Sequence, residues 1–140
     1  MIQLEHLNLV VSDIPRTLAF YRAAFPHWKV RTEGQGSWYG TERRWLHFGD
    51  DYQFLTFNDN GQGSNRNLES NDIGLSHFAF VTNNLVELVD RLKAAGFQPT
   101  QAGGDGKYRK NRYFIDPDGY EVEFVQYLTD VPELRNSNDN

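Results

Sequence analysis

The sequence predicts an α+β fold of two tandem βαβββ modules that form a curled mixed sheet with a shared cleft. The first observation behind this prediction is a repeat: residues 4–11 (LEHLNLVV) and 75–82 (LSHFAFVT) are both strand-like, and their histidines lie 71 positions apart. The second is a helix-like stretch after each of these segments. The third is a set of three extended stretches after each helix.

Side chains alternate in both strand-like segments, and a histidine lies on the face opposite the larger apolar residues. His6 shares its face with Asn8, and His77 shares its face with Ala79. The opposite faces carry Leu7, Leu9 and Val11 in the first copy and Phe78 and Phe80 in the second. We expect these apolar faces to pack into the core.

Each of the two helices is expected to begin at a capping residue and to bury one apolar stripe. Ser12 or Asp13 caps the first helix, with Pro15 in its first turn, and its stripe is Ile14, Leu18, Tyr21 and Phe25. Asn84 caps the second helix together with Glu87, Gly96 ends it, and its stripe is Leu85, Leu88, Leu92 and Ala95.

Extended stretches follow the first helix at about residues 28–32, 38–48 and 53–57, and the second at about 97–100, 108–115 and 121–127. Residues 103–106 are expected to form a flexible glycine loop, and residues 116–119 (DPDG) a tight turn. We expect a single domain at 1–128, with module one at 2–58, a linker at 59–73 and module two at 74–128. A polar, frayed tail follows at 129–140.

Composition excludes several classes of function. The chain of 140 residues has a net charge of −5, which does not favour nucleic acid, and it has no cysteine for disulfides or thiolate sites. There is no signal-peptide pattern at the N-terminus and no apolar run of the roughly 20 residues that span a bilayer. We expect a cytoplasmic protein that binds neither membrane nor nucleic acid.

Three residues at matched places form the candidate metal site. His6 and His77 lie on the first strand of each module, and Glu123 lies on the last strand of the second module. Two imidazoles and one carboxylate are a ligand set for Fe(II), Mn(II) or a similar ion with open positions. Taken singly, each has an ordinary alternative: a hydrogen-bonded histidine, or a solvent-facing glutamate. Their equivalent positions in the repeat favour the metal site.

Four runs resemble a known superfamily: residues 6–13 (HLNLVVSD) with 18–21 (LAFY), 76–80 (SHFAF) and, most specifically, 116–124 (DPDGYEVEF). The first two look like the opening of one vicinal oxygen chelate module, the third like the opening of a second, and the last like its closing hairpin. The superfamily includes glyoxalases, bleomycin resistance proteins and extradiol dioxygenases, and the resemblance covers about residues 2–127. It implies that His6, His77 and Glu123 hold one divalent ion (Fe, Mn, Zn, Ni or Co). It also implies a small-molecule substrate bound through two adjacent oxygens, and a homodimer.

The chain departs from each branch of that superfamily. The position of the fourth glyoxalase I ligand falls on Phe54, which cannot bind a metal. Tyr113 matches a tyrosine near the substrate of extradiol dioxygenases, but the stretch 51–53 lacks the histidine of those enzymes, and His47 is expected on the preceding strand. Fosfomycin-modifying members need further cations, which Lys107, Arg109, Lys110 and Arg112 could supply.

The resulting prediction is a metal-dependent enzyme, either a glyoxalase-like lyase or isomerase or a dioxygenase, with Tyr113 as a catalytic hydrogen-bond or proton donor. The alternative is a non-catalytic drug-binding protein of the bleomycin-resistance type. The cationic run at 107–112 is interpreted as a solvated strand edge rather than a substrate contact. Trp38, Tyr39 and Trp45 are interpreted as core or dimer contacts rather than a stacking surface, and Arg43 with Arg44 as a surface turn.

Overall fold

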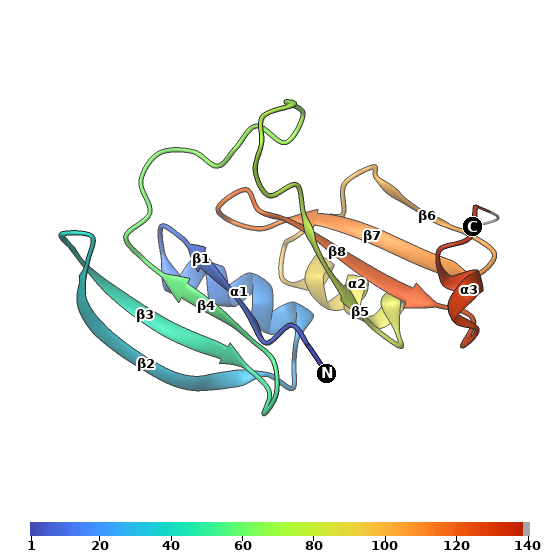
Figure 1. Ribbon diagram of the computed structural model, residues 1–140, viewed down its shortest axis with the longest axis horizontal. Coiled ribbons are helices and arrows are strands. Elements are labelled where there is room, and N and C mark those ends of the chain that lie inside the picture. Colours follow the sequence, from blue (N-terminus) through green and yellow to red (C-terminus); the bar gives the residue numbers. More distant parts are fainter. Residues whose placement is uncertain (139–140) are drawn as a thin grey trace. The chain divides into compact units, whose positions relative to one another are not determined.

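The computed structural model describes residues 1–138, so residues 139 and 140 of the expected tail lie outside the described part (Figure 1). The chain divides into two compact units, Met1–Ser64 and Asn65–Asn140. The elements are β1 His6–Val10, α1 Ile14–Ala24, β2 Lys29–Trp38, β3 Thr41–Gly49 and β4 Phe54–Asn58, then β5 Phe78–Val81, α2 Leu85–Ala94, β6 Gly103–Asp105, β7 Arg109–Ile115, β8 Glu121–Tyr127 and α3 Pro132–Arg135. The α+β class and the βαβββ order, repeated once, are therefore confirmed.

Each unit contains one four-stranded mixed sheet. The strand orders are β1-β4-β3-β2 and β5-β8-β7-β6, and in each sheet the first strand is parallel to the last strand of its unit. The core face of the first sheet carries buried side chains such as Leu9 and Phe57, and Tyr21 of α1 packs on Phe57 with ring centroids 5.1 Å apart. His6 and Asn8 lie on the other face, as the alternation predicts, and we call this face the open face of the first sheet.

Helix α1 begins as expected but buries a different stripe. The Asp13 carboxylate accepts a hydrogen bond of 2.8 Å from the backbone N–H of Arg16, so Asp13 rather than Ser12 is the cap. The buried residues are Ile14, Thr17, Phe20, Tyr21 and Ala24. The expected members Leu18 and Phe25 are only half-buried, because the stripe is turned by one position and small Thr17 and Ala24 face the sheet.

A hairpin lies inside the region expected to be a single strand at 38–48. Strands β2 and β3 meet at the two-residue turn Tyr39–Gly40, whose φ angles are 49° and 78°. Two positive φ angles are the signature of a type I′ hairpin turn. Glycine adopts this conformation readily but tyrosine does not, so the turn has no strong sequence signal. Arg43 and Arg44 accordingly lie in β3, and the prediction of a surface turn there is wrong.

Helix α2 agrees with its predicted limits. The side chain of Asn84 accepts from the backbone N–H of Glu87 at 3.1 Å. At the other end Phe97 N–H donates to Leu92 O at 2.9 Å and Gly96 N–H to Lys93 O at 3.0 Å, with Gly96 at φ 93°. This pair of hydrogen bonds is a Schellman motif, which requires a left-handed residue at Gly96. The stripe residues Leu85, Leu88 and Leu92 are buried, whereas Ala95 is exposed.

Three further expectations for the second unit have different outcomes. The stretch 103–106 is not a flexible loop, because Gly103–Asp105 forms β6 against β7, while residues 97–100 form no strand. In the expected tail, Pro132–Arg135 forms a short helix, and Arg135 lies 4.7 Å over the Tyr127 ring. The tight turn at 116–119 is confirmed, with the buried Asp116 carboxylate accepting from the N–H groups of Asp118 and Tyr120.

None of the helices within residues 1–138 is long and apolar enough to cross a membrane.

Candidate metal centre and its surroundings

The face of the second sheet opposite the buried rings of Phe114 and Phe124, which we call its open face, brings His77 and Glu123 together. His77 lies one residue before β5, and Glu123 lies in the middle of β8, which pairs with β5 in a parallel register. Nε2 of His77 is 3.1 Å from Oε2 of Glu123. The glutamate is 7% exposed, so it is not the solvent-facing side chain that the ordinary alternative expects, while the His77 side chain is 36% exposed.

Two neighbours on β7 hold the Glu123 carboxylate. Asn111 donates from Nδ2 to Oε1 of Glu123 at 2.8 Å, and Tyr113, which pairs with Glu123 in the antiparallel register, also hydrogen-bonds to it. Burial raises the pKa of the Tyr113 phenol, and the charge and hydrogen bond of Glu123 raise it further. Tyr113 therefore stays protonated at neutral pH and is a hydrogen-bond donor.

Each candidate histidine has Nδ1 turned toward a second carboxylate. Nδ1 of His77 is 3.8 Å from Oε1 of Glu121, and Nδ1 of His6 is 2.9 Å from Oε1 of Glu5. The Glu5 carboxylate, 2.9 Å from Nδ1 of His6, favours the tautomer with the proton on that nitrogen, which leaves Nε2 of His6 as the free ligand atom. In His77 the nearer carboxylate is that of Glu123, 3.1 Å from Nε2.

His6 lies in the first unit, next to Phe54, the residue at which the sequence comparison expects a fourth ligand in glyoxalase I. His6 pairs with Phe54 of β4 in register, and their rings stack with centroids 4.7 Å apart. His47 of β3 stacks on the same Phe54 ring at 4.6 Å, so the expectation that His47 belongs to the strand before β4 is confirmed. Burial lowers the pKa of His47, and the positive charges of His6 and Arg31 lower it further.

The donor atoms of the second unit fit a divalent ion. Two ligands on neighbouring corners of an octahedron with bonds of about 2.1 Å lie about 3.0 Å apart, which matches the Nε2 to Oε2 distance of His77 and Glu123. Within residues 1–138, no set of three or more histidine, aspartate or glutamate side chains is grouped around a common metal position. The structure therefore brings together two of the three predicted ligands, and His6 is described only within its own unit.

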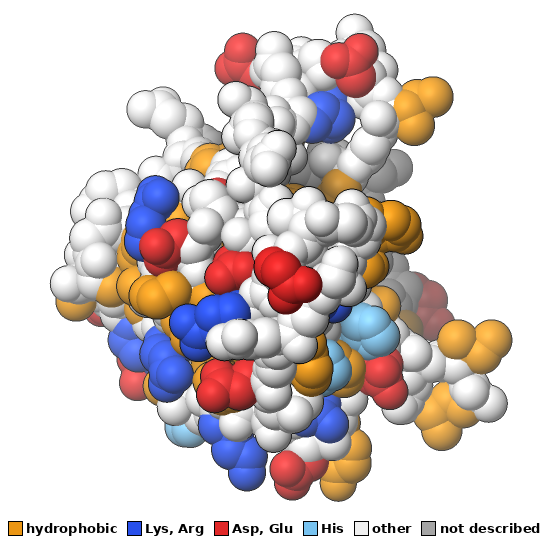
Figure 2. Space-filling view, turned by 90° about the vertical axis from the view of Figure 1, so that its left-hand side faces the viewer, with side chains coloured by type: hydrophobic (Ala, Val, Ile, Leu, Met, Phe, Trp, Pro, Cys, Tyr) orange, Lys and Arg blue, Asp and Glu red, His pale blue; other side chains and the backbone are white. Residues whose placement is uncertain are grey.

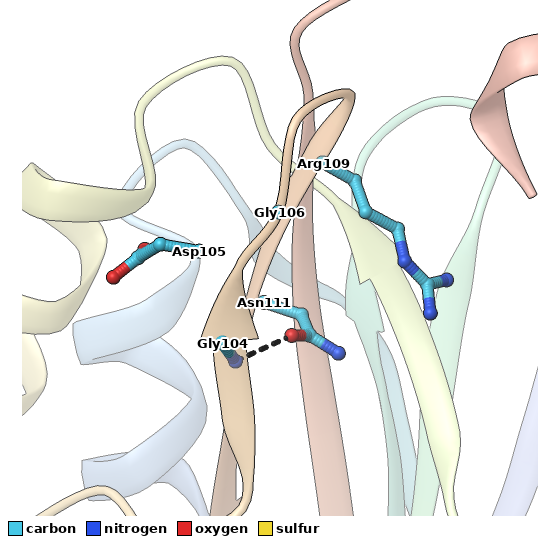
Figure 3. Close-up of a pocket in the computed structure, with 5 residues that line it drawn as sticks. All are labelled: Gly104, Asp105, Gly106, Arg109 and Asn111. Atoms are coloured by element: carbon cyan, nitrogen blue, oxygen red, sulfur yellow. Dashed lines mark hydrogen bonds between the residues drawn. The ribbon is translucent and has the colours of Figure 1, made fainter. Parts of the chain in front are cut away.

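The arginines of the cationic run at 107–112 lie on two different sides of β7. Arg112 makes a bidentate ion pair with Asp105 at 3.1 and 3.2 Å, which supports its interpretation as part of the strand edge. The side chains of Arg109 and Asn111 point away from the Asp105 side chain, as Figure 3 shows. They line a pocket of about 280 Å³ together with Gly104, Asp105 and Gly106. Asn111 also accepts from the backbone N–H of Gly104 at 2.9 Å, so it connects this pocket to Glu123.

Four residues with close contacts in these surroundings were not among the predicted site residues: Glu5, Arg31, Asn111 and Glu121. Asn111 was predictable in part, because alternation along β7 places it on the Tyr113 face. Glu5 and Glu121 have no motif of their own, and their roles depend on which histidine nitrogen they approach.

Comparison with known proteins identifies the superfamily of the chain. A family model of the Glyoxalase/Bleomycin resistance protein/Dioxygenase superfamily matches residues 3–124. A glyoxylase/bleomycin resistance protein/dioxygenase domain from Frankia sp. is similar, with a TM-score of 0.73, 19% identity and coverage of 95% of this chain and 96% of that one. A glyoxalase family protein from Enterococcus faecalis has a TM-score of 0.68 and 20% identity, with 88% and 96% covered.

A further similar structure holds a metal ion. The fosfomycin resistance protein FosX from Listeria monocytogenes, in complex with Mn(II) and sulfate, has a TM-score of 0.62 and 23% identity, with 90% of this chain and 93% of that one covered. A search of curated proteins gave no match. At these identities the structures establish the fold that they share with this chain.

Proposed function

Because the chain belongs to the Glyoxalase/Bleomycin resistance protein/Dioxygenase superfamily, we propose that it is a metal-dependent enzyme that acts on a small oxygen-rich molecule. His6, His77 and Glu123 would hold one divalent ion, and the substrate would bind that ion through two adjacent oxygens. The observation that carries the proposal is the 3.1 Å approach of His77 Nε2 to the buried carboxylate of Glu123.

The chemistry that the ion supplies when bound is polarisation of a carbonyl, enolate or diol pair. The chain's own residues prepare the site around it. Asn111 holds one oxygen of Glu123 at 2.8 Å, which fixes the orientation of the carboxylate. Tyr113 keeps its proton because its pKa is raised, so its hydroxyl is placed to donate a hydrogen bond or a proton to a substrate oxygen.

Metal analysis of the full chain tests this proposal. We expect about one divalent ion per chain, as for a single site with this ligand set. His77→Ala and Glu123→Ala should each remove most of the bound metal. Glu121→Gln is the matched control, because Glu121 lies 3.8 Å from His77 Nδ1 on the same strand as Glu123 but is not a proposed ligand.

The outcome separates the two candidate functions. Loss of metal in the two ligand variants, with Glu121→Gln retaining at least half, supports the enzyme. A chain that binds no divalent ion under any metal supplied, or ligand variants that keep full occupancy, would leave the non-catalytic binding protein as the better description. We also propose a cytoplasmic homodimer, whose assembly is tested separately below.

A further inference from the structure

A continuous row of rings lies on the open face of the first sheet. Trp45 and His47 follow each other on that face of β3, with ring centroids 5.3 Å apart. His47 stacks on Phe54 of β4 at 4.6 Å, and Phe54 stacks on His6 of β1 at 4.7 Å. We call these four residues the ring row. In Figure 2, histidine side chains lie beside hydrophobic ones on the surface shown.

A β-bulge places a positive charge beside the ring row. Val30 pairs with Phe48 and Thr32 with His47, so Arg31 is the extra residue on β2. A bulge redirects the side chain at the irregular position. The guanidinium of Arg31 lies 4.5 Å from the centroid of the Phe54 ring, and within residues 1–138 it makes no hydrogen bond and no ion pair. A guanidinium that rests on a ring keeps its N–H donors available at its edge.

Two carboxylates near the ring row are already engaged. Glu5 contacts Nδ1 of His6 at 2.9 Å. Asp50 accepts from the backbone N–H groups of Tyr52 and Gln53, both at 2.8 Å, and these bonds lower its pKa ahead of any effect of Arg31. The guanidinium of Arg31 at the edge of the ring row therefore remains available to pair with an anion.

The rings themselves also have unused polar groups. Within the described part of the chain, neither the imidazole nitrogens of His47 nor the indole N–H of Trp45 has a hydrogen-bond partner, and both side chains are half-buried. One face of the Trp45 ring rests against β2 at Gly34, where a β-carbon would lie 2.6 Å from Cζ2. The glycine therefore allows the indole to lie flat against the sheet.

From this arrangement we propose that the ring row binds a planar aromatic carboxylate. The aromatic ring of the ligand packs on the half-buried rings of Trp45 and His47, and its carboxylate pairs with the edge of Arg31. Stacking supplies contact area, and the guanidinium selects the anion. The inference rests on the proposed function in one respect: the row ends at His6, so the ligand class is also the substrate class of the metal site.

Binding of two matched probes to the full chain tests the inference. The probes are 2-naphthoate and its neutral counterpart 2-naphthalenemethanol, titrated calorimetrically into the protein as purified and again after removal of metal by a chelator. We expect the carboxylate to bind about fivefold more tightly than the alcohol, as for one accessible ion pair. Arg31→Gln should abolish this preference and leave the affinity for the alcohol unchanged. Arg44→Gln, a surface arginine of β3 in the same sheet, is the matched control and should keep the preference.

Each contrary result is specific. If both probes bind equally to the wild type, or if Arg31→Gln keeps the preference, the assignment of Arg31 is wrong. If the preference for the carboxylate is lost when the metal is removed, the metal rather than Arg31 binds the anion, and this also overturns the inference. If Trp45→Ala leaves both affinities unchanged, the ring row is not the binding surface. Metal content, measured on the same samples, shows separately whether the proposed metal site has failed.

Discussion

His77 and Glu123 meet on the open face of the second sheet, with Nε2 and Oε2 3.1 Å apart. The glutamate is almost completely buried, yet both of its oxygens have partners, because Asn111 holds the second one. A buried carboxylate is stable only when it is paired and hydrogen-bonded. The pair is therefore arranged before any ligand arrives.

The first prediction concerns the ionisation of Tyr113. Glu123→Gln removes the charge that adds to the effect of burial, so the pKa of the phenol should fall while remaining above its ordinary value. A phenol whose pKa is raised on folding stabilises the folded chain fully below its unfolded pKa, and this contribution is lost as pH rises through the folded pKa. Tyrosinate absorbance in the metal-free chain measures the shift, and Tyr113→Phe identifies the transition. An unchanged titration in Glu123→Gln would mean that the two side chains do not interact.

The second prediction concerns the support of Trp45. Gly34→Ala places a β-carbon 2.6 Å from the indole, so the ring must move, at a cost of about 1–3 kcal/mol of unfolding free energy. Gly36→Ala is the matched control, since its nearest contact is 3.9 Å away, at Arg43. Denaturant unfolding measures both, and the fluorescence of Trp45 should change only in Gly34→Ala. Equal stability of the two variants would show that the indole does not rest on β2.

A strand can be predicted from the sequence where one of its faces is buried and the other is not. Alternation in the first strand-like segment correctly separates His6 from Leu9, because a strand with one buried face allows only one register. The same reasoning fails at β6, where Gly103 and Gly104 have no side chains to form a pattern. It fails again at Tyr39, a residue type that rarely adopts positive φ.

Local sequence patterns also cannot predict contacts that depend on the order of strands in the sheet. β4 lies between β1 and β3, and this order alone brings His47 to the ring that His6 stacks on. Nothing local to position 47 distinguishes this histidine from a surface residue. The closing motif does predict the position of Glu123 in β8, because a tight turn determines where the following strand begins. Its partner Asn111 depends in addition on the register of β7 against β8.

The third prediction concerns assembly. The chain exposes apolar side chains on its second unit, including Val81 and Val86, each 69% exposed, and its aromatic content of 14% is more than one small core needs. We expect a homodimer with twice the mass of the 16.2 kDa chain in sedimentation at micromolar concentration. A single species of 16.2 kDa at that concentration would exclude it.

The last prediction concerns the position of the missing fourth ligand. Phe54 is 8% exposed, pairs with His6 and stacks on its ring, so a carboxylate at this position would lie beside a proposed ligand. With Phe54, the three proposed protein ligands would leave up to three positions of an octahedral ion for water or a bidentate substrate. Phe54→Glu should tighten metal binding by about tenfold or more, because it adds an anionic ligand, and should weaken binding of any bidentate ligand, because it uses an open position.

Arg31 and His47 also contact the Phe54 ring, so the loss of the ring needs its own control. Phe54→Leu removes the stacking without adding a ligand, and should cost about 1–2 kcal/mol of stability while leaving metal affinity within about twofold of the wild type. Isothermal titration with Mn(II), followed by a catechol as the bidentate probe, measures both affinities in each variant. If Phe54→Glu matches Phe54→Leu in both titrations, residue 54 does not face the ion. The correspondence between β4 and the ligand-bearing strand of glyoxalase I would then be out of register, and Phe54 would act only as the ring that joins His6 to His47.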